Sequence, residues 1–228
     1  MTGSANEAVE HYEGDTIDPL FIAGARDALY EPHVRGRVLN VGLGYGAWDE
    51  RLNRDSKLQV TGLDIQPELV TRFAGKYSGI NYICADVLMY ETHERFDTIV
   101  ASHLLEHMED PVALLRRFAS WLKPSGRVIV IVPNANSMHR IIGKEMGLLT
   151  EVTDLTEADH KIGHRRVYTR DLLEQDIRTA WFNGAVRNLT FKALSNGQLA
   201  KLPRNYVDAC CRLHDLSNSC QLGAVLTR

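Results

Sequence analysis

Short apolar runs alternate with amphipathic segments along the first half of the chain. Each run is about six residues long and rich in β-branched side chains, the pattern of a buried strand. The runs that predict strands are Arg37–Gly42, Leu58–Leu63, Ile80–Ala85, Phe96–Ala101 and Arg127–Val132. The last run is apolar throughout after its first residue, as expected for a strand that is covered on both faces.

The segments between these runs carry helix signals. Pro67 lies in the first turn of one segment and Gly75 at its end, and Asp110-Pro111 opens another that runs to Trp121. A third helix is predicted over Ala47–Asn53. Strands that alternate with helices in this way predict a doubly wound, mostly parallel α/β sheet of the Rossmann-like class, with helices on both faces.

The alternation stops after the fifth predicted strand. Residues 134–168 show only patchy periodicity and exceed the length of an ordinary connection, so we expect a lid or substrate-binding insertion there. Beyond it, Thr169–Phe182 predicts a helix, and Val186–Leu194 and Cys220–Thr227 predict two closing strands, which brings the sheet to seven. Residues 1–35 are expected to form a helical cover over the site.

Composition narrows the class of protein. The 228 residues, 44% apolar and 24% charged, suit one globular domain. The net charge of −3 disfavours nucleic acid as a partner, and no apolar run approaches the length of a membrane helix. The N-terminus lacks the basic and apolar regions of a secretory signal. The four cysteines match no zinc spacing, so we expect reduced thiols in a cytoplasmic protein.

A glycine-rich loop and two acidic residues follow the first three predicted strands. Gly42, Gly44 and Gly46 allow a sharp turn and close approach to a ligand, but their G-x-G-x-G spacing differs from the dinucleotide pattern. Asp64 can accept both hydroxyls of a ribose, and Asp86 can accept an adenine amino group. A helix cap or a surface carboxylate is the alternative for each Asp alone. Together the three strand ends share one edge of the sheet, where ligands of such folds bind.

The motifs at these strand ends resemble those of the class I S-adenosylmethionine-dependent methyltransferases: VLNVGLGYG, VTGLDIQPELV, YICADV and FDTIVASHLLEHMEDPVALLRRFASWLKPSGRVIVIVPN. The resemblance covers Arg37–Asn134 and, more loosely, Asp159–Phe182. It implies S-adenosylmethionine as cofactor, with the three glycines under its methionine moiety, Asp64 on the ribose, and Asp86 with Val87 around the adenine. The cofactor set that it implies is completed by Asn40, Ile65, Ser102 and Tyr12, the last closing over the cofactor.

Asn40 is a departure from that family's pattern. The family usually has Asp or Glu at this position. Asparagine still forms hydrogen bonds, but it lacks the charge that would pair with the methionine ammonium.

His103-Leu104-Leu105-Glu106-His107 permits several interpretations. Alone, H-x-x-E-H is a zinc-peptidase signature, but no third ligand is identifiable. LLEHMEDP resembles the segment that lines the methyl-transfer site in ubiquinone-biosynthesis-type O-methyltransferases, some of which bind a divalent cation at positions equivalent to His103, Glu106 and His107. We expect no metal here. In one alternative, Glu106 and His107 form hydrogen bonds with backbone groups at the start of a helix. In the other, His103 or His107 is the base or contacts the substrate.

A basic stretch ends the predicted insertion. His164 joins His103 and His107 as a candidate base, and His160, Arg165, Arg166 and Tyr168 are candidate substrate-binding residues. Such a set suits a substrate that bears carboxylate or phosphate, although a solvated charged face is the alternative. The stretch DHKIGHRRVYT also looks like bacterial methyltransferases of the ubiquinone-type group.

The sequence therefore predicts in-line transfer of a methyl group from S-adenosylmethionine to a hydroxyl or amine of a small molecule. The alternatives are an RNA or protein methyltransferase, a non-catalytic cofactor-binding module and an NAD-dependent dehydrogenase. The expected partner is a small-molecule acceptor, with neither membrane nor nucleic acid, and a second copy of the chain is a candidate for a homodimer.

Overall fold

A seven-stranded sheet forms the centre of the computed structural model, which describes residues 16–228. The strand order is β3-β2-β1-β4-β5-β7-β6. Strands β1 to β5 are parallel, and β7 runs antiparallel to both β5 and β6. The strands are β1 Arg37–Val41, β2 Gln59–Asp64, β3 Ile80–Cys84, β4 Phe96–Ser102, β5 Leu122–Pro133, β6 Arg187–Leu189 and β7 Gln221–Leu226. The predicted mostly parallel, seven-stranded α/β sheet is confirmed.

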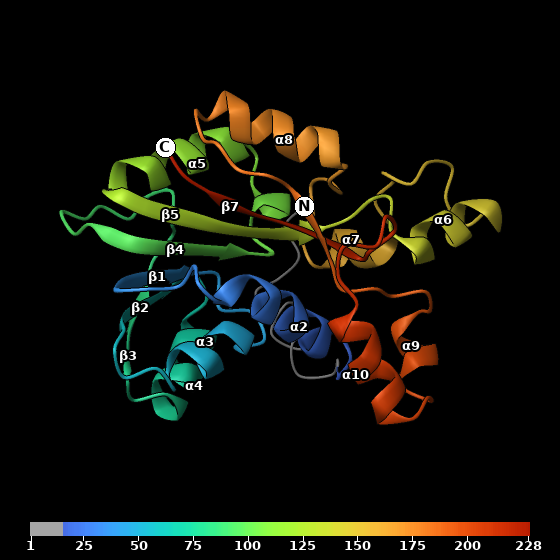
Figure 1. Ribbon diagram of the computed structural model, residues 1–228, viewed down its shortest axis with the longest axis horizontal. Coiled ribbons are helices and arrows are strands. Elements are labelled where there is room, and N and C mark those ends of the chain that lie inside the picture. The colour runs from blue at the N-terminus through green and yellow to red at the C-terminus, as the bar shows by residue number, and fades with distance from the viewer. Residues whose placement is uncertain (1–15) are drawn as a thin grey trace.

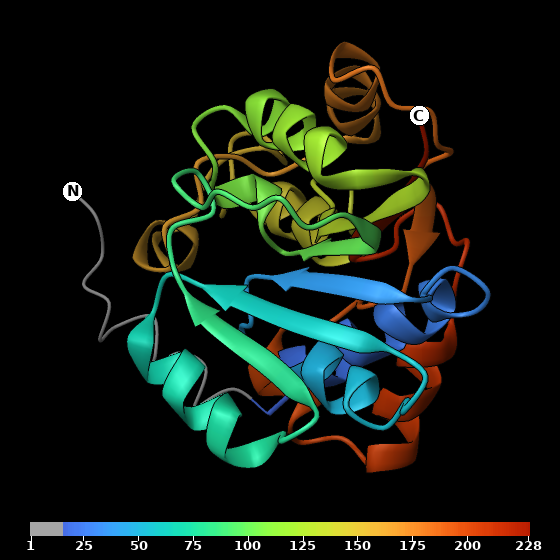
Figure 2. The ribbon, with the colours of Figure 1, turned by 90° about the vertical axis from the view of Figure 1, so that its left-hand side faces the viewer.

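Helices cover both faces of this sheet (Figure 1). The helices are α2 Asp18–Tyr30, α3 Ala47–Leu52, α4 Pro67–Lys76, α5 Pro111–Trp121, α6 Met138–Glu145, α7 Glu157–Lys161, α8 Arg170–Thr179, α9 Asn196–Leu199 and α10 Arg204–Arg212. Helices α5 and α8 lie on one face, and α2, α3 and α4 lie on the other; Figure 2 shows α3 and α4 beside β1, β2 and β3. No helix within residues 16–228 combines the length and apolar character that crossing a bilayer requires.

Alternation along the strands divides the apolar core between the two faces. In β1, Val38 packs with α2, α3 and α4, whereas Leu39 packs with α5 and α8. In β5, Val128 and Val130 face one core and Ile129 faces the other. Both faces of β5 are therefore buried, which explains the continuous apolar run in its sequence.

The structure differs from expectation near the C-terminus and at β5. The predicted strand Val186–Leu194 is only the three-residue β6, Arg187–Leu189, because the backbone of Thr190 turns into the left-handed region with a φ of 48°. The Thr190 hydroxyl donates to Gln221 Oε1, and the chain leaves the edge of the sheet at this residue. Strand β5 starts at Leu122, earlier than the predicted Arg127, since Leu122 pairs with Phe96 of β4.

Residues 134–168 contain the two short helices α6 and α7. Helix α7 begins at a capping box in which the Thr156 hydroxyl accepts from the Asp159 N–H and Asp159 accepts from the Thr156 N–H. The segment rejoins the sheet where Asn134 bridges Tyr168. Both ends of the insertion are thus anchored beside the C-terminal end of β5.

Candidate active site

The register of the sheet brings the predicted strand-end residues to one edge. Val41 of β1 pairs with Leu63 of β2 and with Ala101 of β4. Asp64, the next residue of β2, pairs with Cys84 of β3. The residues that follow these pairs therefore lie side by side at the C-terminal edge of the parallel strands, where the sequence places the site.

The glycine loop turns at this edge in a conformation that favours glycine. Gly42, Gly44 and Gly46 have φ values of 80°, 49° and 74°, all in the left-handed region. A Cβ atom on Gly46 would lie 2.6 Å from the ring of Phe73 on α4. The loop needs glycine for both backbone conformation and close packing, and it places the start of α3 beneath the edge.

Asp64, the last residue of β2, bonds to the glycine loop with one carboxylate oxygen and to the turn after β2 with the other. Oδ2 accepts from the Leu43 N–H at 2.7 Å and Oδ1 from the Gln66 N–H at 2.8 Å. Burial raises the pKa of Asp64, against the lowering effect of these hydrogen bonds. The Ile65 N–H also bonds to this carboxylate, which keeps acceptor capacity for a further donor. The adjacent Ile65 side chain is 61% exposed, an apolar surface beside the carboxylate.

The remaining predicted cofactor residues lie along the same edge. Asp86 is half-buried after β3 and its Oδ1 accepts from the Leu88 N–H at 2.8 Å, while Val87 is buried. Ser102 ends β4, and its hydroxyl is buried with no hydrogen-bond partner among the described residues. Tyr12 lies outside the described residues.

Asn40 lies next to the last residue of β1, at this edge of the sheet. The side chain is fully buried, and Nδ2 donates to Asp49 Oδ2 at 3.0 Å. The Tyr82 hydroxyl donates to the other oxygen of Asp49 at 3.0 Å. Burial raises the pKa of Asp49 to about 6. Asp49 was not among the predicted residues, because an acidic residue in the first turn of a helix is ordinarily solvated.

His103 stands directly after β4 in a strained conformation, with a φ of 53°. Its Nδ1 lies 3.2 Å from Glu106 Oε1, and its Nε2 lies 3.0 Å from the amide nitrogen of Gln221. Because an amide nitrogen only donates, Nε2 is the acceptor and Nδ1 carries the proton toward Glu106. The ring is thus fixed in the tautomer of a general base. Gln221, which lies far away in the sequence, was not among the predicted residues.

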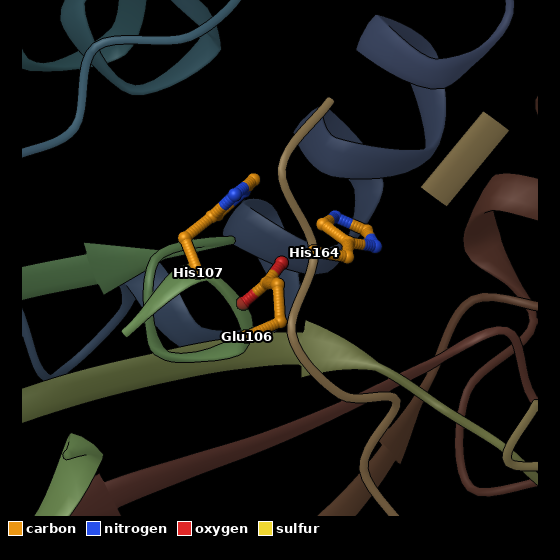
Figure 3. Close-up of side chains that lie close together, drawn as sticks. All are labelled: Glu106, His107 and His164. Atoms are coloured by element: carbon orange, nitrogen blue, oxygen red, sulfur yellow. The ribbon is translucent and has the colours of Figure 1, made fainter. Parts of the chain in front are cut away.

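Glu106, His107 and His164 form a second cluster, shown in Figure 3. One ligand atom from each residue lies within 4.8 Å of the other two. Glu106 is fully buried, and neither carboxylate oxygen has a hydrogen-bond partner of good geometry within residues 16–228. Burial raises the pKa of Glu106, but the surrounding imidazoles, His103 first, outweigh it and the pKa is lowered. Burial lowers the pKa of His107, so its imidazole is held neutral.

This cluster differs from the cation set that the resemblance implies. That set is His103, Glu106 and His107, but the structure groups His164 with the last two and turns His103 toward Gln221. His164 Nδ1 lies 2.9 Å from Asp159 Oδ1, the arrangement that fixes the tautomer of a metal-binding histidine. A buried carboxylate whose only close partner in the described chain is His103, together with two imidazoles, suits a divalent cation, so the described residues fit such an ion.

Three of the four predicted substrate-binding residues, His160, Arg165 and Arg166, line an open hollow of about 670 Å³. Arg166 donates to the carbonyl of Met108 at 2.7 Å, which anchors it to the loop after β4. The Arg165 guanidinium is exposed and makes no ion pair or hydrogen bond with any residue of the described chain. The hollow thus combines one anchored arginine and one unengaged arginine.

The prediction that Tyr168 binds the substrate is wrong. The side chain is fully buried, and its hydroxyl donates to Asp176 at 3.0 Å. Its apolar ring belongs to the core between the sheet and α8, so it has no surface to offer a substrate.

The sheet is Rossmann-like, with an antiparallel β7 between β5 and β6, and a glycine loop lies beside the acidic residue that ends β2. This combination defines the class I S-adenosylmethionine-dependent methyltransferases. The family model described as "Methyltransferase domain" matches residues 17–183. The chain belongs to this family.

Curated relatives are similar to part of the chain. Ubiquinone biosynthesis O-methyltransferase of Xylella fastidiosa is 38% identical over 118 residues, which are 48% of each chain. The protein of the same name from Bradyrhizobium diazoefficiens is 35% identical over 136 residues, 53% of each. The chain thus spans about half the length of the curated relatives it matches.

Solved structures share the fold over nearly the whole chain. A SAM-dependent methyltransferase of Thermotoga maritima aligns with a TM-score of 0.67 at 18% identity, covering 97% of this chain and 94% of that one. The plantazolicin methyltransferase BpumL in complex with SAH aligns with a TM-score of 0.65 at 16% identity, covering 98% and 90%. At these identities the likeness is one of fold.

Proposed function

We propose that this protein transfers the methyl group of S-adenosylmethionine to a hydroxyl or amine of a small molecule that bears a carboxylate or phosphate. The observation that carries the proposal is the alignment of the glycine loop, Asp64 and Asp86 at one sheet edge, in a chain of the methyltransferase family. The curated relatives carry the name of O-methyltransferases, which favours a hydroxyl acceptor.

The cofactor is proposed to lie along this edge. Gly42, Gly44 and Gly46 let the backbone approach the methionine moiety, and the free lone pairs of Asp64 accept the ribose hydroxyls. Asp86 and Val87 border the adenine, with the exposed Ile65 supplying an apolar contact and Ser102 its unpartnered hydroxyl. Tyr12 and the cover of residues 1–35 remain part of the proposal.

His103 is the base that the geometry favours for a hydroxyl acceptor. Its Nε2 is unprotonated and accepts from the Gln221 amide, so the acceptor hydroxyl must displace Gln221 to reach this lone pair. The buried Glu106 carboxylate, 3.2 Å from Nδ1, stabilises the imidazolium that forms when Nε2 takes the proton. The acceptor oxygen then attacks the sulfonium methyl carbon, the C–S bond breaks, and S-adenosylhomocysteine leaves. A positioned base of this kind contributes roughly 10²–10⁴-fold. His107 and His164 remain candidates of lower rank, because their rings pack edge to face against each other with centroids 4.7 Å apart.

A divalent cation, where one is used, would be held by Glu106, His107 and His164. It would supply Lewis-acid polarisation of an acceptor oxygen. The protein's own contribution there is to fix the His164 ring through Asp159, which the Thr156 hydroxyl in turn donates to at 2.7 Å.

The acceptor's anionic group is proposed to bind in the hollow beside residues 134–168. Arg165 offers an unengaged planar guanidinium, and Arg166 and His160 add positive or titratable neighbours. Residues 134–168 would act as a lid over the acceptor within a single domain of residues 1–228. We also propose a cytoplasmic location and a homodimer, with neither nucleic acid nor membrane as partner.

Calorimetric titration of the protein with S-adenosylmethionine, S-adenosylhomocysteine and NAD tests the cofactor. Micromolar binding of the two sulfur nucleosides and none of NAD is expected. A chain that binds NAD instead would be a dehydrogenase, and the proposal would fail.

The variant His103→Asn tests the base. Asparagine tolerates the positive φ of this position, so the loop after β4 should keep its shape while the base is lost. Turnover on a hydroxyl acceptor should fall by roughly 10²–10⁴-fold with cofactor affinity unchanged. His93→Asn, at an exposed position, is the matched control. Unchanged turnover and an unchanged pH profile would remove His103 from the mechanism.

A further inference from the structure

The chain has an asparagine where its family has an acidic residue, yet a carboxylate lies next to it. Asp49 comes from the first turn of α3, nine residues beyond Asn40, and its Oδ2 accepts from Asn40 Nδ2. The glycine loop connects the two positions, so the pair lies directly beneath the backbone that faces the cofactor edge.

The pair is fully buried and its hydrogen bonds are nearly complete. Asp49 is 0% exposed and accepts one bond from Asn40 and one from Tyr82 of β3. Asn40 Oδ1 is the one atom left over, since it is buried and finds no partner among residues 16–228. Asn40 therefore donates to the carboxylate with one end of its amide and presents an unused acceptor with the other.

No positive side chain compensates the Asp49 carboxylate in the described structure. The charged neighbour on β2 is Asp64, which repels it, and the neighbour on β3 is the neutral Tyr82. On the α2 side, Arg26 donates to the Ala47 carbonyl and pairs with Asp27. A buried acid without a cationic partner is destabilising, so a purely structural role would be served as well by asparagine.

We propose that Asp49 is a positioning residue that supplies, from α3, the negative charge for the methionine ammonium of the cofactor, and that Asn40 couples the two. The inference rests on the proposed function. Asn40 Oδ1 accepts from the ammonium, directly or through a bridging water, while Nδ2 stays on Asp49. In this chain the carboxylate is thus on α3 rather than at the end of β1, and the Asn40 amide connects it to the ammonium.

The variant Asp49→Asn removes the charge with little change in shape. Its amide nitrogen would face Asn40, whose amide then flips and uses up the free oxygen. S-adenosylmethionine and S-adenosylhomocysteine, which both carry the ammonium, should each bind about tenfold more weakly or worse by calorimetry. 5′-Methylthioadenosine, which lacks the amino acid moiety, should bind as it does to the wild type. Glu50→Gln, which removes one exposed charge from the same helix, is the control and should change no affinity.

A double variant that combines Asn40→Asp with Asp49→Asn exchanges the two groups. The new amide on α3 can donate to the new carboxylate on β1 and accept from Tyr82, so every hydrogen bond is kept and the carboxylate lies at the family's position. The affinity of this variant for S-adenosylmethionine should return to within about threefold of the wild type, a rescue that a role in packing alone would not produce.

Four results would overturn the inference. Asp49→Asn could bind S-adenosylmethionine as tightly as the wild type, or the double variant could bind as weakly as the single one, which would leave Asp49 a structural role. Equal weakening of 5′-methylthioadenosine would place the effect on the nucleoside. A wild type that binds neither sulfur nucleoside would instead overturn the proposed function, and this inference with it.

Discussion

The Asp64 carboxylate stabilises the fold through hydrogen bonds to two backbone N–H groups. Its two oxygens accept the N–H groups of Leu43 and Gln66, so it joins the glycine loop after β1 to the turn after β2. Burial of that carboxylate raises its pKa, and the backbone donors act in the opposite direction by stabilising the ionised form. A change at Asp64 would therefore disturb the loop geometry together with the proposed ribose contact, which makes Asp49 the better position for testing the role of charge.

The pH dependence of stability reports on Asp49. Its pKa in the folded chain, about 6, lies above the usual 3.8, so the folded state holds the proton more tightly than the unfolded state. This contribution to stability is complete below pH 3.8 and is lost as the pH rises through 6. Between pH 5 and pH 7.5 the wild type should lose about 1 kcal/mol of unfolding free energy relative to Asp49→Asn.

Urea denaturation of both proteins at these two pH values measures that difference, and Glu50→Gln again serves as control. A constant difference between wild type and Asp49→Asn across this range would mean that the Asp49 carboxyl titrates at its ordinary pKa.

At the scale of elements, the glycine loop is shaped by its contact with α4. The left-handed φ of Gly46 and the ring of Phe73 both exclude a side chain there. Gly46→Ala should destabilise the protein by about 1–3 kcal/mol and weaken cofactor binding, because the loop must shift. Thermal denaturation and calorimetry check both effects.

Gly75 provides the matched control for this variant. It lies within α4, has an ordinary helical backbone, and a Cβ on it would meet nothing within 4 Å. Gly75→Ala should therefore stabilise the protein by roughly 0.5–1 kcal/mol. Equal stabilities of the Gly46→Ala variant and the wild type would show that the loop tolerates a side chain.

At the scale of the whole molecule, the net charge bears on the choice of partner. With 26 basic and 29 acidic side chains, the protein lacks the basic surplus from which nucleic-acid affinity mainly arises. We expect no electrophoretic shift of transfer RNA at about 150 mM salt and micromolar protein. A shift that weakens steeply as salt rises would favour the RNA methyltransferase alternative over the small-molecule one.

The sequence predicted the strands and the residues at their ends well, because both are marked by local patterns. The five parallel strands were predicted within a few residues, apart from the early start of β5, because a short apolar, β-branched run is a local signal of a strand. The glycines and the two aspartates followed from strand-end chemistry. Tyr168 was misjudged, since a phenol in a basic stretch gives no sign that its ring enters the core.

The amino-acid sequence by itself determined the class of fold and the sheet edge at which the site is proposed, because strand periodicity and glycine spacing are local properties of the chain. Only the tertiary structure decided which side chains meet. It joined Gln221 to His103, His164 to Glu106, and Asp49 to Asn40 and Tyr82. These contacts depend on strand order, on the path of residues 134–168, and on which face of α3 turns inward, and none of these is encoded by neighbours in the sequence.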